Sequence, residues 1–177
     1  MSESSVCAAV SLDEIEAWID AGLYLRVHPH IENLLSEHGV RAACLAMRAL
    51  RFLGEDRRGD LIGLRLGRRH RGNADAVNAL IRTRIYRHGP YAGWLAFARY
   101  PLPDDASIAA KADYLSLRGF LMALFRDFDV ARNLSEQART LKPEDPWLWV
   151  EWAYCCERAD QYDESPASLM NESPPVH

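Results

Sequence analysis

The spacing of small residues before a proline, late in the chain, constrains its fold most. Counting from Gly119, Ala131 follows twelve residues later, Ala138 seven residues after that, and Pro143 five residues further on. Apolar residues with a helical period surround these positions, and a proline cannot sit deep inside a helix. The spacing therefore predicts two helices that approach closely at small side chains, followed by a break at Pro143.

Part of this pattern returns after 34 residues. A step of that length carries Gly119 to Ala153 and Leu115 to Trp149, and it carries Asp129 to Asp163 in the turn between the helices. Two units with this spacing resemble the tetratricopeptide repeat, in which small residues lie where two helices cross and a proline closes each unit.

The resemblance implies a fold and a division of the chain. The fold expected is all-α, with stacked antiparallel helical hairpins forming a tetratricopeptide-like right-handed α-solenoid, because one amphipathic hairpin cannot bury its apolar face alone. We expect a single helical-repeat domain over residues 1–164, with degenerate repeats at 11–105 and clear units at 106–164. The proline-rich segment 165–177 is expected to be disordered.

Several helix starts are indicated by local signals. Ser11 and Glu14 form a capping box, and Asn73 and Asp145 are expected N-caps, with Pro146 in the first turn of the helix after Asp145. Asp105 is expected to cap a long helix from about residue 106 to 125. Further helices are expected from Pro29 to Gly39 and, more weakly, over residues 60–72, where Gly63 and Gly67 lower the helix propensity.

Composition indicates a soluble protein. Of the 177 residues, 49% are hydrophobic and 26% are charged, and charged residues interrupt every apolar run before it reaches the roughly 20 residues of a membrane helix. The opening residues lack the basic start and apolar stretch of a secretion signal, so a cytoplasmic protein is expected. The four cysteines, Cys7, Cys44, Cys155 and Cys156, lack zinc-site spacing and are interpreted as reduced thiols.

No motif indicates catalysis. The sequence contains no nucleophile elbow, no phosphate-binding loop and no zinc-protease motif, so a non-enzymatic protein without a cofactor is expected. His28, His30 and His38 with Glu32 are the only plausible metal cluster, and a solvated helix start explains them better than a metal site.

The resemblance also implies a partner-binding groove. In the tetratricopeptide family the first helix of each unit lines a concave groove that holds a peptide or protein segment, whereas Trp149 and Trp152 are expected in the core. Carried over by position, the groove residues are Asp113, Ser116, Phe120, Trp147, Val150, Tyr154 and Arg158.

Charge is distributed unevenly along the chain. The net charge is −4, but residues 41–100 carry thirteen arginines against four acids and lie between two acidic flanks. This basic patch either forms a solvated or internally paired helix face or binds an acidic partner or nucleic acid. Its arginines between residues 57 and 87 are Arg57, Arg58, Arg65, Arg68, Arg69, Arg71, Arg82, Arg84 and Arg87.

The sequence therefore favours a protein–protein interaction adaptor or scaffold that binds a partner segment in the groove. Two alternatives stay open: a regulator that binds nucleic acid or an anionic partner through residues 57–87, and a helical module of a larger enzyme. The final helix carries apolar residues on several sides. We therefore expect either a weak homodimer through residues 146–160 or a tail whose Leu169 and Met170 cover this surface.

Overall fold

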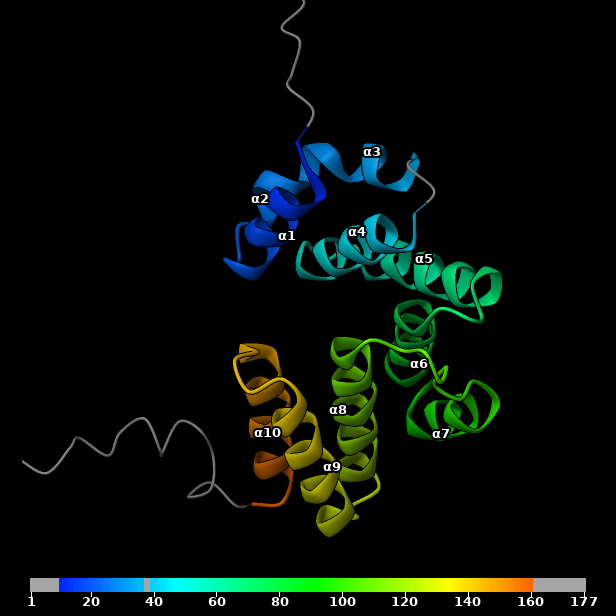
Figure 1. Ribbon diagram of the computed structural model, residues 1–177, viewed down its shortest axis with the longest axis vertical. Coiled ribbons are helices and arrows are strands. Elements are labelled where there is room, and N and C mark those ends of the chain that lie inside the picture. Colours follow the sequence, from blue (N-terminus) through cyan, green and yellow to red (C-terminus); the bar gives the residue numbers. More distant parts are fainter. Residues whose placement is uncertain (1–9, 37–38, 161–177) are drawn as a thin grey trace, which may run out of the picture. The chain divides into compact units, whose positions relative to one another are not determined.

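A computed structural model describes residues 10–36 and 39–160, and within these ranges the chain forms helices, turns and loops but no strand (Figure 1). The all-α prediction is therefore confirmed. The chain divides into two compact units, residues 1–63 and residues 64–177, and the division falls within one helix. The single helical-repeat domain expected over residues 1–164 stays a prediction.

The first unit is built of short helices around one apolar core. Ile15, Ile19, Val27, Ile31 and Leu50 are among its most deeply buried side chains. Within the segment expected as one helix from Pro29 to Gly39, a 3-10 turn (η1) leads directly into α3, and residues 37–38 lie outside the described residues. The elements are α1 (Leu12–Asp20), α2 (Tyr24–Val27), η1 (His28–His30), α3 (Ile31–Ser36), α4 (Val40–Phe52) and the first part of α5 (Asp56–Arg69).

Ion pairs on the first unit join the acidic start of the chain to the arginines that follow. Arg41 Nη2 lies 2.5 Å from carboxylate oxygens of both Asp13 and Glu16, and Arg48 Nη2 lies 2.8 Å from Asp20 Oδ1. These side chains are largely exposed, so solvent screens each pair and each contributes little to stability. The charge asymmetry of the sequence is thus partly balanced within the first unit.

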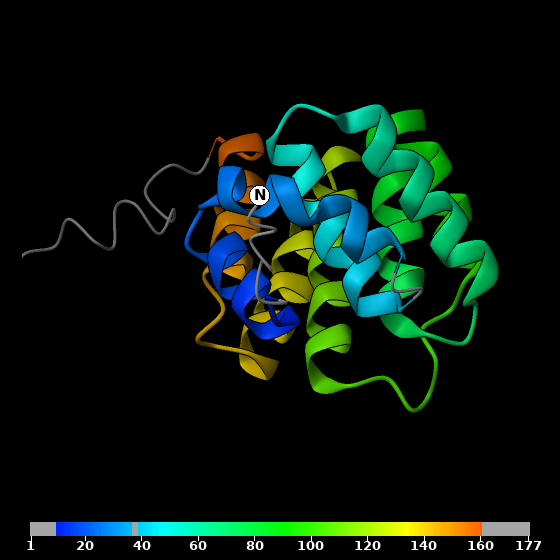
Figure 2. The same cartoon turned by 90° about the horizontal axis from the view of Figure 1, so that it is seen from above.

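The second unit is organised around α8. This helix contacts α6, α7, α9 and α10, while α7 packs on α6 and α10 packs on α9 (Figures 1 and 2). Its elements are the end of α5, α6 (Ala74–His88), α7 (Pro90–Arg99), α8 (Ile108–Leu124), α9 (Phe128–Leu141) and α10 (Pro146–Arg158).

Small residues allow the helices of the second unit to approach closely. A Cβ added to Gly119 would lie 2.9 Å from Ser135 Oγ and 3.1 Å from the Ala131 carbonyl oxygen, so α8 and α9 meet at the glycine indicated by the sequence. A Cβ at Gly67 would collide with Leu80. The weak helix expected here is therefore a complete helix, α5, because close packing offsets the low helix propensity of glycine.

The predicted N-caps are confirmed except at α8. The Ser11 hydroxyl accepts a hydrogen bond from the Glu14 amide, and the side chains of Asn73 and Asp145 accept from backbone amides at the starts of α6 and α10. At α8 the cap is Ser107 instead of Asp105, and its hydroxyl accepts from the Ala110 amide at 3.1 Å.

Candidate functional site

A buried polar network links three helices of the second unit. Arg82 of α6 donates a hydrogen bond to Glu151 of α10, with Nη1 and Oε1 2.7 Å apart. The Ser116 hydroxyl of α8 donates to the second oxygen of the same carboxylate, and Trp147 Nε1 donates to Oε1 at 3.2 Å. Glu151 and Ser116 are buried, with exposed fractions of 5% and 2%. One carboxylate therefore accepts hydrogen bonds from side chains on α6, α8 and α10.

The network is close to charge balance. Burial opposes the charge on the Arg82 guanidinium, but the attraction of Glu151, the hydrogen bond to it and the smaller attractions of Tyr86 and Asp113 together raise the pKa of Arg82 above its ordinary value. Nearby on α8, burial raises the pKa of Asp113 to about 6, and the negative charge of Glu151 adds to this, while Arg82 opposes it. Asp113 is therefore the member of the group whose charge changes near neutral pH.

We expect Asp113→Asn to flatten the dependence of stability on pH. Because the folded state raises the Asp113 pKa from 3.8 to about 6, the stability contributed by its neutral carboxyl is fully present below about pH 4. That contribution is lost as the pH rises through about 6. The free energy of unfolding of the amide variant, relative to that of the parent protein, should therefore be roughly 2–3 kcal/mol higher at about pH 7.5 than at about pH 4. Denaturant unfolding at both pH values measures this difference.

Asp105→Asn is the matched control for this experiment, because Asp105 is an exposed carboxylate in the loop before α8. Its stability relative to the parent protein should be the same at both pH values. An equal pH dependence for the parent protein and Asp113→Asn would show that Asp113 is solvated in the folded protein.

Aromatic and charged side chains lie together beside the network. The rings of Tyr86 on α6 and Phe120 on α8 are stacked with centroids 5.8 Å apart, and the Arg158 guanidinium of α10 lies 5.9 Å from the Phe120 centroid. Tyr86, Phe120 and Tyr154 follow one another at 34-residue steps along the chain. We call the surface formed by Tyr86, Trp147, Val150, Tyr154 and Arg158 the aromatic face.

The structure brings part of the expected groove set together but does not expose all of it. Trp147, Val150 and Tyr154 have exposed fractions of 39%, 39% and 51%. Ser116 and Phe120, by contrast, are buried because the adjacent helices cover them. These two residues support the face from below and cannot serve as its outer contacts.

Three residues of this region were not among the expected groove positions. Tyr86 and Arg82 lie one 34-residue step before Phe120 and Ser116, so continuing the repeat upstream would have found them. Glu151 gave no sequence signal, because its burial depends on which side of α10 packs against α8.

The tryptophans of α10 differ from the expectation. Trp152 is buried, but Trp149 is 36% exposed, so its assignment to the core was wrong. The Trp149 indole donates a hydrogen bond to the Pro143 carbonyl at 3.2 Å and lies under the Arg139 guanidinium at 4.6 Å. The buried side of α10 consists of Leu148, Glu151, Trp152, Cys155 and Cys156.

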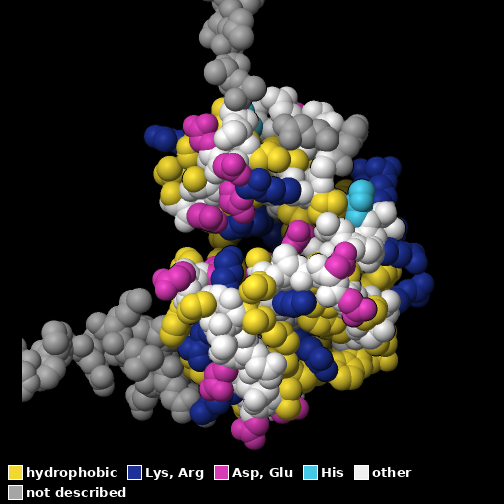
Figure 3. All heavy atoms as spheres, in the orientation of Figure 1, with side chains coloured by type: hydrophobic (Ala, Val, Ile, Leu, Met, Phe, Trp, Pro, Cys, Tyr) yellow, Lys and Arg dark blue, Asp and Glu magenta, His cyan; other side chains and the backbone are white. Residues whose placement is uncertain are grey.

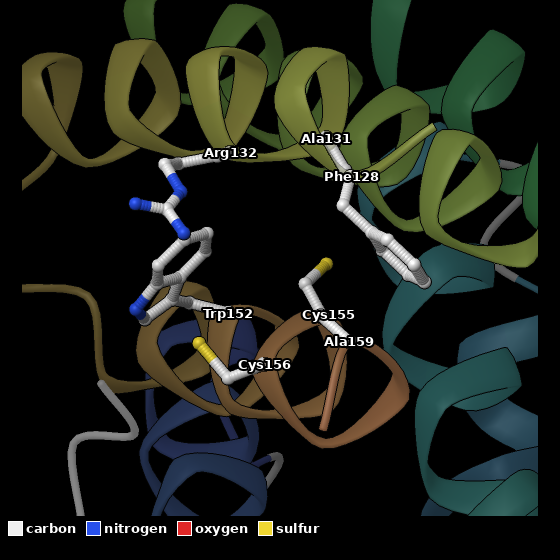
Figure 4. A pocket seen from close by; sticks show the side chains of 7 residues that line it. All are labelled: Phe128, Ala131, Arg132, Trp152, Cys155, Cys156 and Ala159. Atoms are coloured by element: carbon white, nitrogen blue, oxygen red, sulfur yellow. The ribbon is translucent and has the colours of Figure 1, made fainter. Parts of the chain in front are cut away.

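A small cavity lies where α10 packs on α9. In Figure 4, Trp152, Cys155 and Cys156 of α10 face Phe128, Ala131 and Arg132 of α9. Its volume of about 10 Å³ is far below the several hundred Å³ of a small-molecule pocket. Burial also raises the pKa of the Cys155 thiol to about 11, which makes it unreactive at neutral pH. This cavity is a packing feature.

The arginines of the basic patch fall into two groups. Arg58 pairs with Glu32 and with Glu55, and Arg82 belongs to the buried network, so these two are internally paired. Others are exposed, and in Figure 3 dark blue side chains gather over the end of α5. The exposed members at and after the end of α5 are Arg65, Arg68, Arg69 and Arg71.

Residues 10–36 and 39–160 contain neither a candidate metal site nor a candidate membrane-spanning helix. No group of three or more His, Cys, Asp or Glu side chains in these ranges is placed to hold a metal ion. None of the helices described there combines the length and apolar character needed to cross a membrane. His38 of the candidate metal cluster lies outside the described residues.

Neither a model of a known protein family, nor a curated protein, nor a solved structure matches this chain.

Proposed function

We propose that the chain is a non-enzymatic adaptor that holds a segment of a partner protein on the aromatic face. The observation that carries this proposal is the meeting of α6, α8 and α10 at Glu151, beside aromatic residues spaced 34 residues apart. Tyr86, Trp147 and Tyr154 remain substantially exposed although each is large and apolar. Exposed aromatic side chains of this kind are enriched where proteins bind other proteins.

The packing of the second unit supports a tetratricopeptide-like arrangement. Contacts between consecutive helices pair α6 with α7 and α8 with α9, and α8 also contacts α6 and α10. Gly119 and Ala131 lie where α8 meets α9, at the spacing of that family. In such an arrangement α6, α8 and α10 are the first helices of consecutive units and share the groove side.

The aromatic face favours a partner segment with apolar anchors and one acidic group. Trp147, Val150 and Tyr154 offer apolar area along α10, and Arg158 adds a positive charge at the end of that helix. Among the described residues Arg158 forms no ion pair, and its guanidinium lies over the Phe120 ring. A guanidinium stacked in this way keeps its N–H edge available for a carboxylate.

We expect Tyr154→Ala to weaken partner binding while leaving the melting temperature nearly unchanged, because this side chain is 51% exposed. Peptides selected from a displayed random library against the full chain provide the probe. Their affinities, measured by calorimetry, should fall about tenfold or more in Tyr154→Ala. Arg158→Gln should lower the affinity for those selected peptides that carry an acidic residue.

Tyr91→Ala is the matched control, because Tyr91 is a 68% exposed tyrosine on α7 of the same unit. It should leave peptide affinity within about twofold of the parent value. Selected peptides that bind Tyr154→Ala as well as they bind the parent chain would contradict the proposed site. A stability loss in Tyr154→Ala as large as that of a core substitution would instead assign Tyr154 to the core.

A further inference from the structure

A second, separate cavity lies on the second unit, between the loop that follows α5 and the loop that follows α7. Its volume is about 570 Å³, which falls within the range of small-molecule sites. The residues that line it are Arg71, Gly72, Arg99, Tyr100, Pro101, Leu102, Pro103 and Asp104. None of them belongs to the aromatic face.

Two arginines of this cavity flank one tyrosine ring. The Arg71 guanidinium carbon lies 5.9 Å from the Tyr100 ring centroid, and that of Arg99 lies 6.0 Å from the same centroid. Both arginines are exposed, and neither forms an ion pair with a described residue. A guanidinium held beside a ring keeps donors that match the oxygens of a phosphate or carboxylate. The cavity thus contains two positive groups without a carboxylate bound to either.

The remaining walls of the cavity are suited to the body of a ligand. Tyr100, Pro101, Leu102 and Pro103 form a largely apolar lining, against which a ring or another flat group can pack. Asp104 adds one acceptor for a hydroxyl or amino group. The exposed arginines at the end of α5 precede Arg71 in the chain.

We propose that this cavity binds a small phosphomonoester of about nucleotide size, with Arg71 and Arg99 holding the phosphate and Tyr100 packing against the ring. The two guanidinium charges match a phosphate group that carries nearly two negative charges at neutral pH. An open depression of about 570 Å³ has room for a single nucleotide. A nucleic-acid strand needs a continuous groove instead, in which successive bases stack.

The test is calorimetric titration of the full chain at low ionic strength with adenosine monophosphate, inorganic phosphate, adenosine and a short mixed-sequence RNA. Adenosine monophosphate should bind about tenfold more tightly than inorganic phosphate, and adenosine should bind no better than phosphate. Arg71→Gln and Arg99→Gln should each weaken adenosine monophosphate binding about tenfold or more. Both side chains are exposed, so both variants should keep the parent melting temperature.

Arg126→Gln is the matched control, because Arg126 is also an exposed arginine whose guanidinium lies over an aromatic ring, 5.7 Å from the Phe128 centroid, outside the cavity. It should leave the affinity within about twofold of the parent value. The proposal is overturned if adenosine monophosphate fails to bind at millimolar concentration or binds no better than phosphate. It is also overturned if Arg126→Gln weakens the binding of adenosine monophosphate as much as Arg71→Gln and Arg99→Gln do. RNA that binds more tightly than the nucleotide and is retained by the Arg71→Gln/Arg99→Gln double variant would assign binding to a strand on the surface instead.

Discussion

Replacing Glu151 by alanine is expected to lower the free energy of unfolding by about 3–5 kcal/mol. The substitution removes the carboxylate that accepts hydrogen bonds from Arg82, Ser116 and Trp147. Arg82, whose side chain is only 17% exposed, would keep its charge without a partner, and the buried Ser116 hydroxyl would lose its acceptor. Leaving a buried charge unpaired accounts for most of this loss. Denaturant unfolding of the parent and variant chains measures it.

Glu157→Ala is the control on the same helix, because Glu157 is exposed. It should change stability by no more than about 0.5 kcal/mol. A double variant, Arg82→Met with Glu151→Met, should recover most of the loss of Glu151→Ala, since it leaves neither charge of the pair buried without its partner. A loss below about 1 kcal/mol in Glu151→Ala would show that water reaches the pair and that it does not hold the three helices together.

Local chemistry explains why the sequence predicted some helix N-termini correctly. The caps at Ser11, Asn73 and Asp145 depend on a side chain and a backbone amide two or three residues apart, and the sequence contains both partners. At α8 two candidate caps, Asp105 and Ser107, lie two residues apart. Ser107 forms the cap, although nothing in the local pattern separates it from Asp105.

The close approach of α8 and α9 was also predicted, because it depends on residue size. Gly119 leaves no room for a Cβ beside Ser135 and the Ala131 carbonyl, so the small residues of the repeat mark a real approach of two helices. The division of the chain into two units was not predicted. That division depends on which helices contact one another, and the amphipathic pattern of α5 continues across it.

Burial of the candidate site could be predicted only in part, because sequence spacing places residues on a helix but does not fix its rotation against its neighbours. Successive residues are about 100° apart around a helix, so a shift of one residue changes which side is covered. On α10 the covered side contains Leu148, Trp152 and Glu151, whereas the sequence favoured Trp149 with Trp152. The same rotation leaves Trp147 and Tyr154 substantially exposed, as the repeat resemblance implied.

Replacing Trp152 by alanine should lower the free energy of unfolding by about 3–5 kcal/mol, because Trp152 is 6% exposed and packs against α9 with Cys155 and Cys156 (Figure 4). The small cavity already present beside it indicates that the neighbouring side chains do not close every gap. The much larger space left by alanine should therefore stay largely unfilled. Denaturant unfolding measures the loss, and the slope of the transition shows whether the variant still unfolds in one step.

Trp149→Ala is the matched comparison on the same helix. Trp149 is 36% exposed, and alanine would remove one hydrogen bond to the Pro143 carbonyl and one contact with the Arg139 guanidinium. Interactions of this kind at partly exposed sites are worth about 1–2 kcal/mol together. The order of the two losses therefore reports the rotation of α10 in solution. A larger loss for Trp149→Ala than for Trp152→Ala would indicate that α10 has the orientation favoured by the repeat pattern. In that orientation the residues assigned to the aromatic face would be buried.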